Sequence, residues 1–131
     1  MDVTATLSLG DPLEPARKAT AEMLQTRERT YSLPQPFYTD ERLFQIDMQE
    51  IFHKEWLIAG MTCEIPAKGN YITLQIGKNP IIVVRGAEGK VHAFHNVCRH
   101  RGSRLCVSEK GKVAKLVCPY HQWTYELDGC L

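Results

Sequence analysis

Two short stretches of the chain carry residue types that could bind a metal: "HNVCRHRG" at 95–102 and "CPYHQW" at 118–123. In the first stretch, Cys98 and His100 flank a single residue. Side chains two positions apart in an extended backbone point to the same side, so this thiol and this imidazole can face one site. The first stretch therefore predicts a loop with one sulfur ligand and one nitrogen ligand.

The second stretch repeats this pair of residue types at a slightly wider spacing. Cys118 and His121 flank Pro119 and Tyr120, which favour a turn that brings both side chains inward. Residues 101–117 lie between the two pairs and can form a hairpin that sets the loops side by side. The spacing predicts one centre held by two thiolates and two imidazoles, from Cys98, His100, Cys118 and His121.

Two kinds of metal centre accept this ligand set. Zinc takes two cysteines and two histidines in a closed tetrahedron, usually with a wider spacing within each pair and often with the histidines on a helix. A two-iron, two-sulfide Rieske centre takes two cysteines on one iron and two histidines on the other. The observed spacings fit the iron centre better, and a structural zinc module is the alternative.

Bulk composition narrows the class of protein. The chain has 131 residues, 44% of them hydrophobic, and a formal charge of +1. This charge gives no overall field that would recruit nucleic acid or an anionic membrane, and no apolar run approaches the roughly 18 residues of a membrane span. Residues 1–11 lack the features of a secretory signal, so we expect a cytoplasmic protein with a single core.

The cysteines form an odd set that cannot all pair within the chain, and a reducing compartment would keep them as thiols. We therefore interpret the paired Cys and His spacings as metal ligation and not as a disulfide framework. The five cysteines are Cys63, Cys98, Cys106, Cys118 and Cys130.

The first half of the chain has helical periodicity. The segment "DPLEPARKATAEMLQTRERTY" at 11–31 predicts a helix that Asp11 caps. Its basic end, at Arg27 and Arg29, would complement the helix dipole.

A proline-rich connector and a second helix follow. Two prolines in "SLPQPF" at 32–37 forbid helical continuation and predict an extended segment. The next helix is expected from Thr39 or Asp40 to about Lys54. Its apolar stripe contains Leu43, Phe44, Met48, Ile51 and Phe52.

From Trp56 onward the period of the sequence changes towards two. Short β-branched or aromatic runs are separated by Gly, Pro and Asn, which predicts strands and turns. The expected strands are "WLIAG", "YITLQIG", "PIIVVRG", "KVHAF", "KVAKLVC" and "WTYEL". Hairpin turns at 77–80 and 86–90 predict an antiparallel sheet, either a compact meander or a barrel.

The last residues, "ELDGCL", place an Asp-Gly turn at 128–129, with two residues left to begin a returning strand. A complete domain rarely ends on the first step of a hairpin. We therefore expect the chain to be a piece of a longer protein.

The two-loop pattern resembles the Rieske family, and its flanks resemble the front of Rieske non-haem iron oxygenase large (alpha) subunits. The matching residues are "NVCRHRGSRLC" and "CPYHQWTYELDG", with "FYTDERLFQIDMQEIFHKEWLIAG", "IPAKGNYITL" and "PIIVVRGAEGKVHAFHN" before them. The resemblance implies a mainly β chain with N-terminal helices: a helical segment at 1–55 and a Rieske-type [2Fe-2S] antiparallel β-sandwich or barrel at 56–131. It also implies a further C-terminal catalytic domain, absent here, that holds a mononuclear non-haem Fe(II).

Within this family the chain is similar to oxygenases that act on quaternary ammonium compounds. This implies a homotrimeric monooxygenase that N-demethylates glycine betaine to dimethylglycine, with release of formaldehyde, and takes electrons from NAD(P)H through a flavin or ferredoxin-type reductase. The small-molecule substrate would bind the missing domain, while this chain would only transfer electrons, with His121 as the expected exit to the mononuclear iron. The alternatives are the Rieske domain of an aromatic ring-hydroxylating dioxygenase and a free-standing Rieske ferredoxin, against which the helical start argues.

Some positions depart from the patterns of the family. Gln122 follows the second histidine, where the family usually has Gly, and Cys130 stands where Arg is common. Respiratory Rieske proteins also carry a disulfide between the loops and a serine that donates to the cluster, whereas this chain has Ser103, Tyr120 and Trp123 at the matching positions. Without that disulfide or hydroxyl, we expect a potential near the low end of the Rieske range of about −150 to +300 mV.

The other histidines have simpler interpretations. Glu50 and His53 share a spacing used in di-iron helical bundles, but a single copy predicts an ordinary solvated helix face. His92 and His95 are likewise expected to be structural. No convincing set of two histidines and a carboxylate for a mononuclear iron is present in the sequence.

Several residues near the two ligand loops have expected roles of their own. The first loop carries three arginines, which form either a positive rim for an acidic electron donor or neighbouring subunit, or ordinary solvated charge: Arg99, Arg101 and Arg104. We expect Trp123 and Tyr125 to fill the core and Tyr120 to shield the cluster from water. Gly102 is expected to let backbone amides approach the sulfides.

Overall fold

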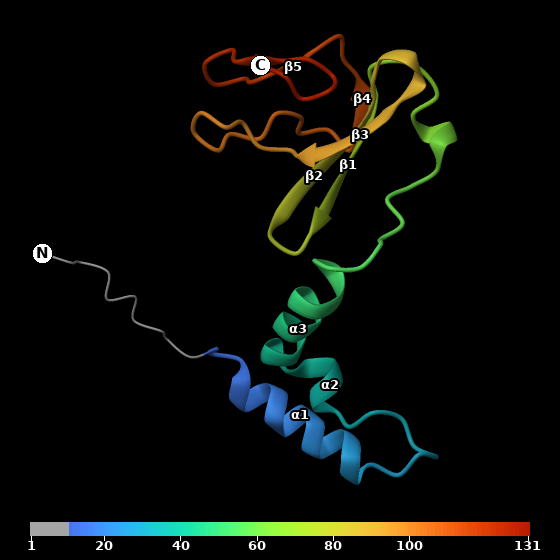
Figure 1. Ribbon diagram of the computed structural model, residues 1–131, viewed down its shortest axis with the longest axis vertical. Coiled ribbons are helices and arrows are strands. Elements are labelled where there is room, and N and C mark those ends of the chain that lie inside the picture. Colours follow the sequence, from blue (N-terminus) through green and yellow to red (C-terminus); the bar gives the residue numbers. More distant parts are fainter. Residues whose placement is uncertain (1–10) are drawn as a thin grey trace, which may run out of the picture. The chain divides into compact units, whose positions relative to one another are not determined.

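The structure, a computed structural model, describes residues 11–131, so the expectation drawn from the first ten residues lies outside it. The chain forms two compact units, of which the first ends at Trp56 and the second spans Leu57–Leu131. The α-helices belong to the first unit and the strands to the second (Figure 1). No helix within the described residues has the length and apolar character that crossing a membrane requires.

The first unit is built from four short helical segments. They are α1 (Glu14–Thr26), α2 (Pro36–Thr39), α3 (Glu41–Asp47) and a π-helical turn, η1 (Met48–Phe52). Its buried apolar side chains are Ala16, Leu43 and Met48. The rest of the predicted stripe, Phe44, Ile51 and Phe52, stays exposed in this chain.

Helix α1 is shorter at both ends than predicted. Asp11 does not cap it. Instead, its carboxylate accepts the amide of Leu13 at 2.9 Å and the guanidinium of Arg17 at 3.0 Å, which stabilises a turn ahead of the first helical residue. The helix ends at Thr26 because Arg27 adopts an extended backbone, with φ −69° and ψ 145°. The basic residues beyond that point therefore do not complement the helix dipole.

The second predicted helix begins where expected. Oδ1 of Asp40 accepts the amide of Arg42 at 2.9 Å, which confirms Asp40 as the cap of α3. The helical ladder continues to Phe52 through the π-helical turn. Part of the predicted extended connector is helical, because Pro36 occupies the first position of α2, where its fixed φ is favourable.

The second unit is built on a four-stranded antiparallel sheet. Its strands are β1 (Asn70–Ile76), β2 (Asn79–Arg85), β3 (Val91–His95) and β4 (Lys110–Lys112), in the order β3-β2-β1-β4. The turn between β1 and β2 starts at Gly77, whose φ of 57° is left-handed and costs glycine little. A separate ribbon pairs β5 (Leu116–Val117) with β6 (Thr124–Tyr125). The predicted mainly β fold with N-terminal helices is confirmed.

Two of the predicted strands differ from expectation. The run "WLIAG" forms no strand in the described structure, and its Ile58 is 95% exposed. Strand hydrogen bonds come from a neighbouring strand, so an apolar run without one stays irregular. The run "KVAKLVC" is split, because Lys112 pairs with β1 whereas Leu116 pairs with Tyr125 in the ribbon.

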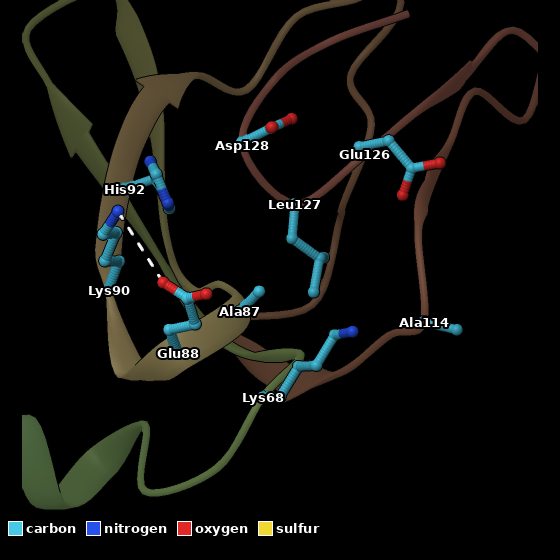
Figure 2. A pocket seen from close by; sticks show the side chains of 9 residues that line it. All are labelled: Lys68, Ala87, Glu88, Lys90, His92, Ala114, Glu126, Leu127 and Asp128. Atoms are coloured by element: carbon cyan, nitrogen blue, oxygen red, sulfur yellow. Dashed lines mark ion pairs between the residues drawn. The ribbon is translucent and has the colours of Figure 1, made fainter.

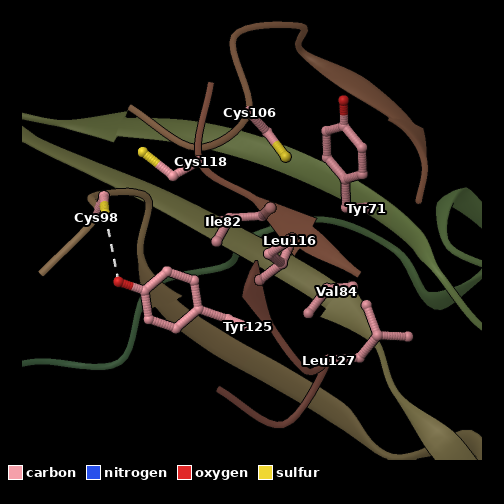
Figure 3. Packing of buried hydrophobic residues seen from close by; sticks show 9 residues of the cluster. All are labelled: Tyr71, Ile82, Val84, Cys98, Cys106, Leu116, Cys118, Tyr125 and Leu127. Carbon is pink, nitrogen blue, oxygen red and sulfur yellow. Dashed lines mark hydrogen bonds between the residues drawn. The ribbon is translucent and has the colours of Figure 1, made fainter. Parts of the chain in front are cut away.

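The expected single core is not what the structure shows, because this unit has two apolar clusters. The smaller contains Ile65, Ile72 and Val83, and the larger joins side chains from the sheet, the ribbon and the intervening loops. Figure 3 shows its members: Tyr71, Ile82, Val84, Cys98, Cys106, Leu116, Cys118, Tyr125 and Leu127. Ile82 and Val84 are fully buried, and burial of such a side chain contributes roughly 1.5–3 kcal/mol. Because two of the predicted ligand thiols belong to this core, the packing that stabilises the sheet also fixes the ligand loops.

The cap of α3 makes the helical unit sensitive to acid. The guanidinium and the amide of Arg42 lower the pKa of Asp40 to about 2, so ionised Asp40 stabilises the folded state above its unfolded pKa and loses this effect as the pH falls. We expect helical circular dichroism to fall between about pH 4 and pH 2. Asp40→Asn should remove this contribution, whereas Asp47→Asn, at the other end of α3, should keep it; equal acid profiles would contradict the prediction.

Candidate metal centre

The first ligand loop is a tight turn built around the backbone of Cys98. The amide of Cys98 donates to the carbonyl of Ser103 at 2.7 Å, and the amide of Gly102 donates back to the carbonyl of Cys98 at 2.9 Å. Gly102 has a left-handed φ of 72°, so its backbone conformation already favours glycine. An isolated bridge between Val97 and Arg104 closes the base of the loop.

The second loop repeats this backbone pattern. The amide of Cys118 donates to the carbonyl of Trp123 at 2.8 Å, and the amide of Gln122 donates to the carbonyl of Cys118 at 3.0 Å. Gln122 has φ 59°, the left-handed conformation that glycine takes in the first loop. A non-glycine residue there costs on the order of 1 kcal/mol, which explains why glycine suits this position.

The thiols of the two loops lie together in the core. Cys98 and Cys118 are each only 1% exposed. The hydroxyl of Tyr125 lies 3.3 Å from Sγ of Cys98 (Figure 3). This bond lowers the pKa of Cys98, and the side chain of Cys118 contributes to the lowering, which favours the thiolate that metal ligation requires.

Tyr125 makes a contact that the sequence did not predict. Its hydroxyl oxygen accepts the amide of Arg99 at 3.1 Å, which leaves the hydroxyl proton free to point at Sγ of Cys98. The prediction that Tyr125 fills the core is correct, since it is 6% exposed, but the side chain also ties the second loop to the first. Alternation along β6 indicates only that it faces inward, and no local pattern shows what its hydroxyl reaches.

The two predicted imidazole ligands lie at the surface. The rings of His100 and His121 are exposed, with centroids 4.8 Å apart. The indole of Trp123 lies parallel to His100 at 4.9 Å, and Tyr120 lies against His121 at 3.8 Å. The expectation that Trp123 fills the core is therefore wrong, because it is 37% exposed and covers a histidine.

The four donors form two chemically different pairs, with sulfur inside and nitrogen outside. Within residues 11–131, no three Cys, His, Asp or Glu side chains converge closely enough to hold a single metal ion. A tetrahedral zinc site needs all four donors around one point, whereas a [2Fe-2S] Rieske cluster needs a sulfur pair and a nitrogen pair on separate irons. The arrangement of the donors fits the cluster.

The remaining three cysteines are free thiols. Cys106 is buried, and burial raises its pKa, so its thiol stays protonated. Its side chain bonds to the hydroxyl of Tyr71. Cys63 and Cys130 are exposed.

Other residues singled out in the sequence are not brought into the candidate centre. Glu50 lies in the helical unit, where its carboxylate pairs with Arg17 at 2.9 Å and with Lys54. His53 follows η1 in the same unit. In the other unit, the ring of His92 stacks parallel to Phe94 at 5.9 Å on β3. These placements agree with structural roles.

The three arginines of the first loop are all exposed: Arg99, Arg101 and Arg104. Within the part of the chain that the structure describes, none of them forms an ion pair with a carboxylate. One of them donates to the side chain of Gln75 at 3.0 Å. The exposed imidazole of His100 therefore lies in a loop whose arginines have no ion-pair partner among the described carboxylates.

A polar cavity of about 400 Å³ lies elsewhere in this unit (Figure 2). Three basic and three acidic side chains line it: Lys68, Lys90, His92, Glu88, Glu126 and Asp128. The amide of Cys130 donates to the carboxylate of Asp128, and this bond is the main cause of its lowered pKa. No predicted ligand lines the cavity.

Sequence comparison finds a highly similar protein. The chain is 86% identical over 131 residues to the glycine betaine monooxygenase oxygenase subunit of Pseudomonas aeruginosa (strain UCBPP-PA14), covering 100% of this chain and 30% of that protein. The chain thus spans about 30% of the length of the curated relative it matches.

Two solved structures are similar in fold. A quaternary ammonium Rieske monooxygenase, described with carnitine oxidation by gut microbiota and inter-subunit electron transfer, has a TM-score of 0.68 and 38% identity, over 72% of this chain and 26% of that one. Naphthalene 1,2-dioxygenase from Rhodococcus sp. bound to indole has a TM-score of 0.75 and 29% identity, over 86% and 26%. The family model of the Rieske [2Fe-2S] domain matches residues 55–131, and the chain belongs to this family.

Proposed function

We propose that this chain holds a [2Fe-2S] cluster through Cys98, Cys118, His100 and His121 and serves as the electron-transfer part of an oxygenase subunit. The observation that carries the proposal is the sorting of donors into a buried thiol pair and an exposed imidazole pair. When bound, such a cluster takes up and gives up one electron at a time.

The residues of the chain supply what that role needs. The core excludes water from the two thiols, and the hydroxyl of Tyr125 offers a hydrogen bond to one of them. The aromatic partners of His100 and His121 fix the ring orientations while leaving both imidazoles at the surface. We propose His121 as the electron exit, because an exposed imidazole can donate its free N–H to a partner group.

We further propose that the whole protein N-demethylates glycine betaine. The 86% identity over the full chain to a glycine betaine monooxygenase oxygenase subunit supports this substrate. One oxygen atom of O₂ would oxidise a methyl group that leaves as formaldehyde, and the other would become water, with consumption of two electrons and two protons. Dimethylglycine is the second product. This chemistry is assigned to a mononuclear non-haem Fe(II) in a catalytic domain that this chain does not include.

Two other functions are less well supported. An aromatic ring-hydroxylating dioxygenase would share the fold, but naphthalene 1,2-dioxygenases are 29–41% identical to this chain, against 86% for the glycine betaine monooxygenase oxygenase subunit. A free-standing Rieske ferredoxin would not need the helical segments between Glu14 and Phe52. We therefore retain a helical segment at 1–55 and a Rieske domain at 56–131 as the domain organisation.

The proposed partners follow from the electron path. A flavin or ferredoxin-type reductase would supply electrons from NAD(P)H, and the uncompensated arginines of the first loop would attract an acidic donor. We propose a cytoplasmic location, because a reductase of this kind draws on the NAD(P)H of that compartment. The proposed oligomer is a homotrimer, in which the imidazole pair of one subunit would face the iron of the next.

The expected spectrum depends on the two buried ligand thiols. Cys98→Ser should abolish the visible absorption and the electron paramagnetic resonance signal of the reduced cluster. Cys106→Ser, which changes a buried thiol outside the proposed ligand set, should keep both.

The full-length protein with its reductase should release formaldehyde and dimethylglycine from glycine betaine in equal amounts. A colourless zinc protein, or a protein that converts arenes to diols and leaves glycine betaine unchanged, would contradict the proposal.

The reduction potential should depend on the hydroxyl of Tyr125. A hydrogen bond to a ligand sulfur stabilises the more negative, reduced form, so Tyr125→Phe should lower the midpoint by on the order of 50 mV. A redox titration followed by visible absorption measures the shift. Tyr71→Phe is the matched control, because it removes the hydroxyl of another buried tyrosine that bonds to the non-ligand Cys106. An unchanged midpoint in Tyr125→Phe would show that this hydroxyl does not tune the centre.

A further inference from the structure

Asn96 stands at the junction between the main sheet and the first ligand loop. It directly follows β3, and its amide donates to the carbonyl of Pro80 in β2 at 2.8 Å, which extends the ladder between these strands by one residue. The amide of Val97 then bonds to the carbonyl of His95 at 2.7 Å, which bends the chain at Asn96. Two residues later the chain reaches Cys98.

The side chain of Asn96 closes the loop that its backbone opens. Its Nδ2 donates to the carbonyl of Cys106 at 2.6 Å, and its Oδ1 accepts the amide of Cys106 at 2.9 Å. Asn96 is 1% exposed, so both bonds lie away from water. The carboxamide thus pairs with both the N–H and the C=O of Cys106, as a residue on a facing strand would.

Comparison of the two loops shows what this pairing replaces. Below the second loop, two consecutive backbone pairs continue the ladder, Val117 with Thr124 and Leu116 with Tyr125. Below the first loop there is one backbone pair, the bridge between Val97 and Arg104, which corresponds to the pair of Val117 with Thr124. The backbone amide of the next residue, Asn96, is already bonded to β2. The carboxamide therefore supplies the support that the first loop would otherwise lack.

We propose that Asn96 is a positioning residue for the iron-sulfur cluster: its carboxamide, clamped on the peptide groups of Cys106, holds Cys98 and His100 in place relative to the second loop. This inference rests on the proposed function, since it concerns the geometry of the proposed ligands. Its physical basis is that both peptide groups of the clamp are buried and have no water to replace the carboxamide.

Asn96→Asp tests the clamp without creating a cavity. The carboxyl group keeps an acceptor for the amide of Cys106 but places an oxygen opposite its carbonyl. In the cluster-loaded protein, we expect a chelator to bleach the visible absorption of Asn96→Asp at least about tenfold faster than that of wild type. The resonance signal of the cluster that remains should also shift. Asn70→Asp is the control, because Asn70 likewise accepts a backbone amide, that of Ala67 at 2.9 Å, but lies outside the ligand loops.

Two results would overturn the inference. One is an Asn96→Asp protein whose bleaching rate and resonance signal match those of Asn70→Asp. If Asn96→Asp does not fold, hydrogen exchange on the wild-type protein decides: removal of the cluster should speed exchange at the amides of Cys98 and Cys106 together. If the exchange rate of the Cys106 amide is the same with and without the cluster, Asn96 stabilises the fold in general and does not position the cluster. Absence of any iron-sulfur spectrum in wild type would instead refute the proposed function.

Discussion

Two thiols buried in the apolar core of a small sheet are the constraint on which the rest of this structure depends. A thiolate in such a place is unfavourable unless a metal, hydrogen bonds or both offset the lost hydration. In this chain the hydroxyl of Tyr125 bonds to Sγ of Cys98, and side chains from the sheet and the ribbon surround both sulfurs. The imidazoles lie in water instead. His100 follows Cys98 by two residues and His121 follows Cys118 by three, and both rings are exposed at the surface.

The two ligand loops have the same backbone turn but are held by different neighbouring structures. Each places its cysteine in the same turn and its fourth following residue in a left-handed conformation, glycine in one loop and Gln122 in the other. The second loop stands on the β5-β6 ribbon. The first loop stands on the carboxamide of Asn96, because the adjacent backbone is committed to the main sheet. Tyr125 joins the ribbon to the first loop, since it belongs to β6 and its hydroxyl accepts the amide of Arg99.

Local signals predicted much of this architecture. Period-two runs and the turn at Gly77 located β1, β2 and β3, and the cap at Asp40 located the start of α3. The spacing of cysteines and histidines selected the four side chains that the structure sorts into two pairs, although their role as ligands remains a prediction. What the sequence could not predict depends on distant partners: the reach of Tyr125 to Cys98, the stacking of Trp123 on His100 and the clamp of Asn96. The irregular "WLIAG" run shows the converse, strand propensity with no neighbour to satisfy it.

The placement of Trp123 has an optical consequence. The chain has two tryptophans, and the other, Trp56, is fully exposed. An indole in water fluoresces freely, whereas an indole that lies flat on a histidine of the proposed iron-sulfur site would lose its excitation to the cluster. Tryptophan emission from this chain should therefore come almost entirely from Trp56, while the emission of Trp123 is quenched. The emission wavelength then reports on the burial of Trp56.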